Sequence, residues 1–258
     1  MHFVDRDSVS APTELLQQLQ EKHGPKWHGY HQQKQENLKP KQPSDSEWRN
    51  TEVLAPLALL FQHNCGYCGI ALMCPTTDDG ISYHGQVDHY HPKSEAPDLV
   101  YAWPNYIWSC PACNRRKSDY YQPTCLIFNP CCKADMDCLG YNEGTGAYYL
   151  HPQEEGGRVV QARFAATIRH TYFNTDDYNK KRRTRWQTIK SLLDALHTTY
   201  LHSMLSSDKQ QDYERKFKVL QDELEMPSNF RLMLKQQFEI YRKNHPDFPL
   251  SNSELGLC

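Results

Sequence analysis

The chain has 258 residues, a formal net charge of −2 and a hydrophobic content of 38%. Its apolar runs are all shorter than the ~18 residues that a membrane-spanning helix needs, so no membrane span is predicted. The near-neutral charge provides no overall basic field for nucleic acid, so any contact with phosphates must come from local groups of Lys and Arg.

The cysteine content favours metal sites over disulfides. The first residues, MHFVDRDSVS, lack the apolar core of a secretory signal, so the chain is expected in the cytoplasm. Ten cysteines in a long cytoplasmic chain predict metal ligands.

The N-terminal region is expected to contain two helices joined by an irregular arm. Residues 12–22 have helical character, whereas residues 24–43 are polar, contain several prolines and follow no sustained period. Ser44 and Glu47 stand at capping-box spacing, which predicts a second helix from Glu47 towards Gln62.

The centre of the chain carries two C-x-x-C pairs, Cys65 with Cys68 and Cys110 with Cys113. Four thiolates presented by two tight turns favour tetrahedral Zn²⁺ over Mg²⁺ or Ca²⁺. Such a structural zinc contributes on the order of 10 kcal/mol to the folding of a small unit. The alternatives are four unrelated buried thiols, or a zinc module without catalysis. The other central cysteines do not form C-x-x-C pairs, which disfavours a second zinc site. They are Cys74, Cys125, Cys131, Cys132 and Cys138.

The segment between the two pairs predicts two short strands followed by a helix. Residues 72–86 are polar, with a DDG turn at 78–80, and are expected to form a loop. Residues 86–90 and 106–108 are short enough for the strands of a hairpin, and residues 114–121 are expected to be helical.

Asp88 and His89 lie between the cysteine pairs. Phosphodiester hydrolysis needs a base that deprotonates water, which suits imidazole, and Asp88 offers a hard oxygen ligand for Mg²⁺ or Mn²⁺. Adjacent residues on a regular strand face opposite sides of the sheet. Asp88 and His89 can therefore serve one site only if the backbone bends at the end of the strand, near Pro92. Without this context, His89 would be an ordinary core or surface histidine.

Asn114 directly follows Cys113, so zinc would fix its position. Its amide oxygen could complete a metal site with Asp88, and the alternative role is a helix N-cap. Asn105, after Pro104, is either a site residue or an ordinary turn residue.

A cluster of basic residues surrounds this segment and would contact nucleic acid. Alternatively, these residues are ordinary solvent-exposed charges without a ligand. His91 either contacts a phosphate or leaving group, or packs. The candidates for this group are His91, Lys93, Arg115, Arg116 and Lys117.

The remainder of the chain is expected to be mostly helical. Residues 125–149 suggest another small hairpin. Helical periodicity then recurs with charged faces at residues 162–170, 176–204, 208–224 and 229–244. The fold class is therefore α+β, divided into an N-terminal arm with helices (1–62), a zinc-bearing core (63–150) and a helical C-terminal region (151–258).

The motifs CGYC, VDHYHP, WPN and CPACN together resemble the zinc-bearing ββα-metal (HNH) endonucleases. The resemblance implies a phosphodiester hydrolase in which His89 is the general base, while Asp88 and Asn114 ligate the catalytic ion. Asn105 corresponds to the central Asn, which holds the His89 loop through side-chain to backbone bonds. The third motif position is Asn114 rather than His.

A wider set of segments is similar to the PtuB family of HNH nucleases. These segments are FVDRDSVSAPTELL, VDHYHPKSEAPDLVYAWPNYIWSCPACNRRKSD and ATIRHTYFNTDDYNKKRRTRW. This resemblance implies the nuclease effector of a Septu or retron-linked antiphage defence system. It also implies a PtuA-like ABC/SMC-type ATPase as partner, and control by a retron reverse transcriptase with its DNA product.

Two other functions compete with a DNA endonuclease. One is an HNH ribonuclease acting on tRNA or other RNA, which a contact to the 2′-hydroxyl would distinguish. The other is a zinc adaptor without catalysis, which would need neither Asp88 nor His89.

Overall fold

The computed structural model describes residues 1, 3–44, 46–75, 81–152, 157–203, 207–225, 229–251 and 253–255. The α-helices are α1 (Thr13–Gln35), α2 (Thr51–Leu60), α3 (Pro111–Lys117), α4 (Lys133–Asp137), α5 (Arg158–His170), α6 (Asp176–Ser203), α7 (Ser207–Leu224) and α8 (Arg231–Asn244). The strands form three antiparallel pairs, β1 (Met73–Pro75) with β2 (Ile81–Tyr83), β3 (Gln86–His89) with β4 (Tyr106–Ser109), and β5 (Leu139–Tyr141) with β6 (Tyr148–Leu150). Among the described helices, none has the length and apolarity needed to cross a membrane.

The central unit is the β3–β4 hairpin with α3 packed against it. In the hairpin, Asp88 pairs with Ile107 and His89 pairs with Tyr106. The α+β class and the ββα order that the sequence predicts are confirmed. Helix α3 begins at Pro111, earlier than expected, because proline suits the first helical position and the Cys110 sulfur accepts a hydrogen bond from the Cys113 N–H at 3.3 Å.

Helix α1 differs from the sequence expectation. It continues to Gln35 through Gly24 and Pro25, where an irregular arm was predicted. The reason is tertiary packing, because Trp27 is completely buried and its ring lies 6.1 Å from that of Trp48. Burial of a large aromatic side chain outweighs the unfavourable helix propensity of single Gly and Pro residues.

Helix α2 begins later than predicted. Glu47–Arg49 form a separate 3₁₀ turn, and Asn50 is the N-cap of α2, accepting a hydrogen bond from the Glu52 N–H at 3.0 Å. The predicted capping box at Ser44 and Glu47 is therefore not the start of this helix, because Asn50, six residues after Ser44, caps it instead.

The polar segment after the first cysteine pair is also more regular than expected. It forms the short β1–β2 hairpin instead of a loop. The predicted turn at 78–80 lies outside the described residues. The β5–β6 hairpin and helices α5 to α8 agree with the sequence prediction.

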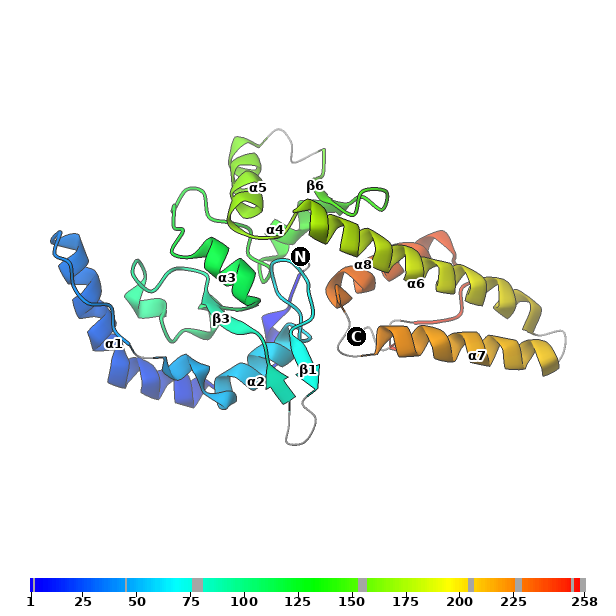
Figure 1. Ribbon diagram of the computed structural model, residues 1–258, viewed down its shortest axis with the longest axis horizontal. Coiled ribbons are helices and arrows are strands. Elements are labelled where there is room, and N and C mark those ends of the chain that lie inside the picture. The colour runs from blue at the N-terminus through cyan, green and yellow to red at the C-terminus, as the bar shows by residue number, and fades with distance from the viewer. Residues whose placement is uncertain are drawn as a thin grey trace.

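Two hydrophobic cores organise the molecule. The first joins the N-terminal segment, the β3–β4 hairpin, α3 and α5, and extends to Phe173. The second lies among α6, α7 and α8. Figure 1 shows the corresponding arrangement, with α1 at one end, the β3–α3 unit in the middle and α6 to α8 at the other end.

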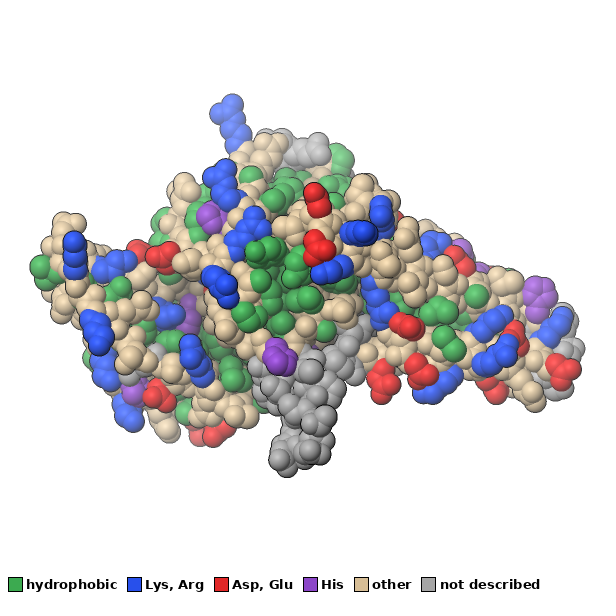
Figure 2. All heavy atoms as spheres, in the orientation of Figure 1, with side chains coloured by type: hydrophobic (Ala, Val, Ile, Leu, Met, Phe, Trp, Pro, Cys, Tyr) green, Lys and Arg blue, Asp and Glu red, His purple; other side chains and the backbone are tan. Residues whose placement is uncertain are grey.

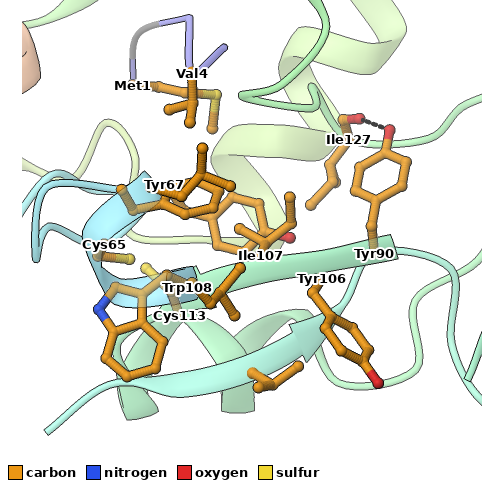
Figure 3. Close-up of a cluster of buried hydrophobic side chains, with 14 of the residues drawn as sticks. Met1, Val4, Cys65, Tyr67, Tyr90, Tyr106, Ile107, Trp108, Cys113 and Ile127 are labelled. Atoms are coloured by element: carbon orange, nitrogen blue, oxygen red, sulfur yellow. Dashed lines mark hydrogen bonds between the residues drawn. The ribbon is translucent and has the colours of Figure 1, made fainter. Parts of the chain in front are cut away.

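Aromatic side chains fill the first core beneath the hairpin. Figure 3 shows Tyr67 between the N-terminal residues Met1 and Val4 and the hairpin, with the Trp108 ring on the opposite side of the hairpin. The hydroxyl of Tyr90 donates a hydrogen bond of 2.6 Å to the Ile127 carbonyl, which ties the end of β3 to the later part of the chain. The hairpin is therefore supported from both sides.

Candidate metal centre and catalytic site

The four predicted cysteine ligands come together in one buried cluster. The sulfur atoms of Cys65, Cys68, Cys110 and Cys113 all lie within 4.8 Å of one another, and those of Cys68 and Cys110 are 3.8 Å apart. A tetrahedral Zn²⁺ with Zn–S bonds of about 2.3 Å requires sulfur separations of about 3.8 Å. The cluster therefore has the donor chemistry and the spacing of a structural zinc site.

The local backbone shapes each cysteine pair into a tight turn. The Gly69 N–H donates to the Cys65 carbonyl at 2.8 Å, and Gly69 adopts a φ of +81°, which L side chains rarely take. On the second pair, the Tyr172 N–H donates to the Cys113 sulfur at 3.4 Å. Burial opposes ionisation of Cys65, but hydrogen bonds from the other three thiols lower its pKa, which favours the thiolate that zinc needs.

Asp88 is buried, and both oxygens of its carboxylate have a polar partner. Its carboxylate accepts a hydrogen bond of 2.6 Å from the Tyr67 hydroxyl and forms an ion pair of 3.1 Å with the Lys117 ammonium. Lys117 also donates to the His89 carbonyl at 2.7 Å. Burial raises the pKa of Asp88 above its usual value, while Lys117 and Tyr67 oppose that increase. The carboxylate thus already faces a positive charge inside the protein.

Polar side chains of β3 and of α3 face one another. Gln86 and Asp88 lie on one face of the strand because side chains alternate, and Asn114 and Lys117 lie one helical turn apart. The Asn114 amide donates to the Gln86 amide oxygen at 2.9 Å, beside the Lys117–Asp88 pair. Carboxylate and amide oxygens are ligands that Mg²⁺ and Mn²⁺ prefer. Asp88 and Asn114 thus carry oxygen atoms on facing elements, but both carboxylate oxygens of Asp88 are already bound, one by the Tyr67 hydroxyl and one by the Lys117 ammonium.

His89 points to the opposite face of β3 from Asp88, because β3 stays regular through His89 and the chain bends only afterwards, at Tyr90 and His91. The bend needed for both side chains to serve one site is therefore not formed before His89, and the structure does not bring the two side chains to one face of the strand. One of its ring nitrogens, Nε2, is 2.9 Å from the Val100 carbonyl oxygen, which fixes the neutral tautomer with the proton on Nε2. The ring meets Trp48 and Tyr106 edge-on, with centroids 4.8 and 5.2 Å away. Burial lowers the pKa of His89 well below its ordinary value, and the charge of Lys93 lowers it further. A neutral imidazole with a free Nδ1 lone pair is the form that accepts a proton.

Asn105 connects the residues that follow His89 to the β4 side of the hairpin. Its side-chain oxygen accepts from the His91 N–H at 2.7 Å, and its amide donates to the carbonyls of His91 and Leu99 at 3.0 and 2.9 Å. The chain bends at Tyr90 and His91, directly after the strand. These three bonds hold that bend in one conformation.

The basic residues are in three different settings. Arg115 and Arg116 are exposed on α3, as expected for contacts with phosphates. Lys93 is half-buried, with its ammonium 5.0 Å from the centre of the Trp48 ring. Lys117, however, is only 1% exposed because the helical period turns it towards β3, so it is not available to a phosphate on the surface. His91 is half-buried against Tyr121.

The structure adds residues that the sequence reasoning did not identify. Tyr67, between the first two cysteines, holds Asp88, and the Val100 carbonyl holds His89. Strand alternation could have suggested Gln86, two positions before Asp88. The contact of Trp48 with His89 could not be predicted from a local motif, because Trp48 lies outside the central segment.

Four later cysteines remain separate from the cluster. Within the part of the chain that the structure describes, the first cluster is the one group of three or more potential metal ligands. The partly exposed cysteines are Cys125, Cys131, Cys132 and Cys138. The side chain of Cys74 lies outside the described residues.

Comparison with known proteins supports the assignment of the central segment. The family model of the HNH endonucleases matches residues 65–120. The chain is also similar to the Septu protein PtuB of Bacillus thuringiensis, with 30% identity over 89 residues. That alignment covers 34% of this chain and 32% of the relative, so it spans about a third of each protein. No solved structure matches the chain significantly.

Proposed function

We propose that the HNH endonuclease domain at residues 65–120 makes this protein a metal-dependent endonuclease that hydrolyses phosphodiester bonds of nucleic acid. The observation that carries the proposal is the cysteine cluster, whose sulfur atoms lie within 4.8 Å of one another. This cluster anchors the start of α3 beside β3, so that the polar residues of the two elements meet. The same residues match the HNH family, which supports a catalytic use of the arrangement.

In this proposal, His89 is the general base. Its imidazole is held by the Val100 carbonyl at 2.9 Å, and burial with the Lys93 charge keeps it neutral. It accepts the proton of the attacking water at Nδ1. Asn105 positions the bend after His89 through its bonds to His91 and Leu99.

Asp88 and Asn114 would hold a catalytic Mg²⁺ or Mn²⁺, and the four cysteines a structural Zn²⁺. The divalent ion supplies stabilisation of the negative charge that develops on the scissile phosphate. Tyr67 and Lys117 orient the Asp88 carboxylate towards that role. Arg115 and Arg116 contact phosphates outside the reacting group.

We further propose a role in antiphage defence, because the matched relative is a Septu protein. The partner would be a PtuA-like ABC/SMC-type ATPase, with control by a retron reverse transcriptase and its DNA product. A nuclease that is active in the cytoplasm would damage its own cell, so control by a partner is expected. The surface for such a partner would be either the region after residue 150, largely α5 to α8, or the N-terminal arm.

The substrate test compares DNA and RNA directly. The purified full-length protein, alone and with the candidate ATPase, is incubated with mixed DNA, mixed RNA and tRNA, with Mg²⁺, Mn²⁺ or EDTA. We expect cleavage that requires a divalent ion, and the cleaved pool identifies the substrate. Absence of cleavage in every arm, including those with the partner, would contradict the proposal.

A further inference from the structure

A groove of ≈ 650 Å³ opens on the side of α3 that faces away from β3. It is lined by residues 70–72 of the first cysteine turn, by the outer side of α3, and by Tyr172 and Tyr178. Its volume falls within the range of about 300–1,000 Å³ that is usual for small-molecule sites. Asp88 and His89 do not line it, so this Tyr–Arg groove is separate from the candidate catalytic centre.

The groove presents flat groups that are held in place. The rings of Tyr172 and Tyr178 are half-buried, with centroids 5.9 Å apart. The Arg116 guanidinium lies 4.8 Å from the centre of the Tyr172 ring, and its Nε donates to the Arg169 carbonyl at 2.9 Å. Aromatic rings and guanidinium planes are the surfaces on which unpaired bases stack.

Positive charge borders the groove on the α3 side. Arg115 and Arg116 are both exposed there, and Arg115 directly follows Asn114, a candidate ligand of the catalytic ion. At the other side, Lys181 lies 5.2 Å from the centre of the Tyr178 ring and pairs with Asp177. Figure 2 shows hydrophobic side chains gathered on this face between α3 and the start of α6, with Lys and Arg side chains towards α3 and both acidic and basic side chains towards α6. The apolar surface with its cationic edge on the α3 side complements a base and its phosphate.

We propose that the Tyr–Arg groove binds an unpaired nucleotide of the nucleic-acid substrate, away from the phosphate that is cleaved. The base stacks on the Tyr178 ring, the Tyr172 ring, tilted by 47° from it and already in contact with Arg116, borders the groove, and Arg115 contacts the phosphate. The inference rests on the proposed nuclease function and adds the substrate class, a single-stranded or looped strand. A base in a duplex has both faces covered by its neighbours, so it cannot stack on these rings without leaving the helix.

The test measures binding of the full-length protein to fluorescent oligonucleotides without divalent ion, so that no cleavage occurs. The probes are a single strand, a hairpin loop and a blunt duplex, each as DNA and RNA. We expect single strands and loops to bind about tenfold more tightly than the duplex. Tyr178→Leu should lose about tenfold or more in single-strand affinity, whereas Tyr178→Phe, which keeps the ring, should bind like the wild type.

Arg115→Gln is the second variant, because Arg115 is exposed and its replacement leaves the apolar packing intact. It should weaken single-strand binding and reduce the salt dependence by about one phosphate contact. Equal single-strand affinity of the wild type, Tyr178→Leu and Arg115→Gln overturns the inference, and is the result expected if the groove receives a protein segment instead. If Tyr178→Leu does not fold, as judged by zinc content and thermal unfolding, the preference of the wild type for single strands and loops over the duplex decides. Cleavage by the wild type with unchanged binding by both variants rejects the groove and retains the nuclease. Binding without cleavage in any arm, including those with the candidate ATPase, rejects the nuclease.

Discussion

Lys117 shows how one buried side chain changes the electrostatics of the candidate catalytic site. Its ammonium is 1% exposed, and it joins Asp88 and the backbone of His89 in one network. A buried carboxylate without a partner is strongly unfavourable, so the pair keeps Asp88 charged before any divalent ion arrives.

Replacing Lys117 with Met should therefore destabilise the protein by about 3–5 kcal/mol in the absence of divalent ions, because Asp88 stays buried without its partner. Added Mn²⁺ should recover part of that loss, since the ion replaces the missing positive charge. Thermal unfolding with Mn²⁺ and with EDTA measures both effects. Lys34→Met, at a half-exposed surface pair, is the control and should change little. A Lys117→Met protein as stable as the wild type in EDTA would mean that the pair does not support the site.

The setting of His89 determines the expected pH dependence. Burial and the Lys93 charge disfavour the imidazolium, so the folded-state pKa lies below the ordinary value of about 6.5. Cleavage should therefore persist as the pH falls through 6.5 and decline only at lower pH. Lys93→Met removes a positive charge, which raises the pKa of His89 and should move the acidic limb of the kcat profile to higher pH. An unmoved limb would show that Lys93 does not influence the base, and a move to lower pH would contradict the assigned sign of its effect.

At the scale of elements, the two cysteine turns fix α3 against the β3–β4 hairpin. Cys110 belongs to the cluster and is also the N-cap of α3, so one residue serves both the metal site and the helix start.

Cys110→Ser should release zinc and lower the unfolding temperature by many degrees, because it opens the thiolate cage, whereas serine can still cap the helix. Bound zinc per protein and thermal unfolding test this. Cys138→Ser, at a thiol outside the cluster, is the matched control and should keep its zinc. A Cys110→Ser protein with full zinc and wild-type stability would exclude a structural role for the cluster.

The sequence predicts this central unit well because its signals are local. Paired cysteines, two short apolar segments and a proline at the start of a helix each specify a turn, a strand or a helix within a few residues. The continuation of α1 through Pro25 could not be predicted in this way, because it depends on the packing of Trp27 on the distant Trp48. The partners of Asp88 escaped prediction for the same reason, since Tyr67 and Lys117 come from different elements.

On the scale of the whole molecule, the C-terminal helices are attached to the first cysteine turn. The Phe230 N–H donates to the Gly69 carbonyl at 2.7 Å, and the Asn229 side chain accepts from the Ala71 N–H at 2.9 Å. Arg182 of α6 is fully buried and donates to the carbonyls of Gly146 and Phe173, which joins α6 to the first core. A partner bound to these helices would therefore be mechanically connected to the zinc site.

The exposed apolar side chains of Leu201 on α6 and Val219 on α7 offer a test of partner docking. If this side of the helices contacts the ATPase, replacing both residues with Asp should reduce co-purification with it by at least tenfold. Zinc content and thermal unfolding should stay unchanged, because both side chains are exposed. Gln187→Asp, at an exposed polar position of α6, is the control. Wild-type recovery of the ATPase by the double variant would remove this surface from the proposal.

The most direct measurement of the central claim is cleavage by the wild type and His89→Ala at equal zinc content and equal concentration of divalent ion. We expect His89→Ala to keep its four-cysteine zinc site and its fold but to lose at least about 10²-fold in cleavage rate, because it lacks the base but no zinc ligand. Cleavage by His89→Ala at the wild-type rate would exclude His89 as the general base.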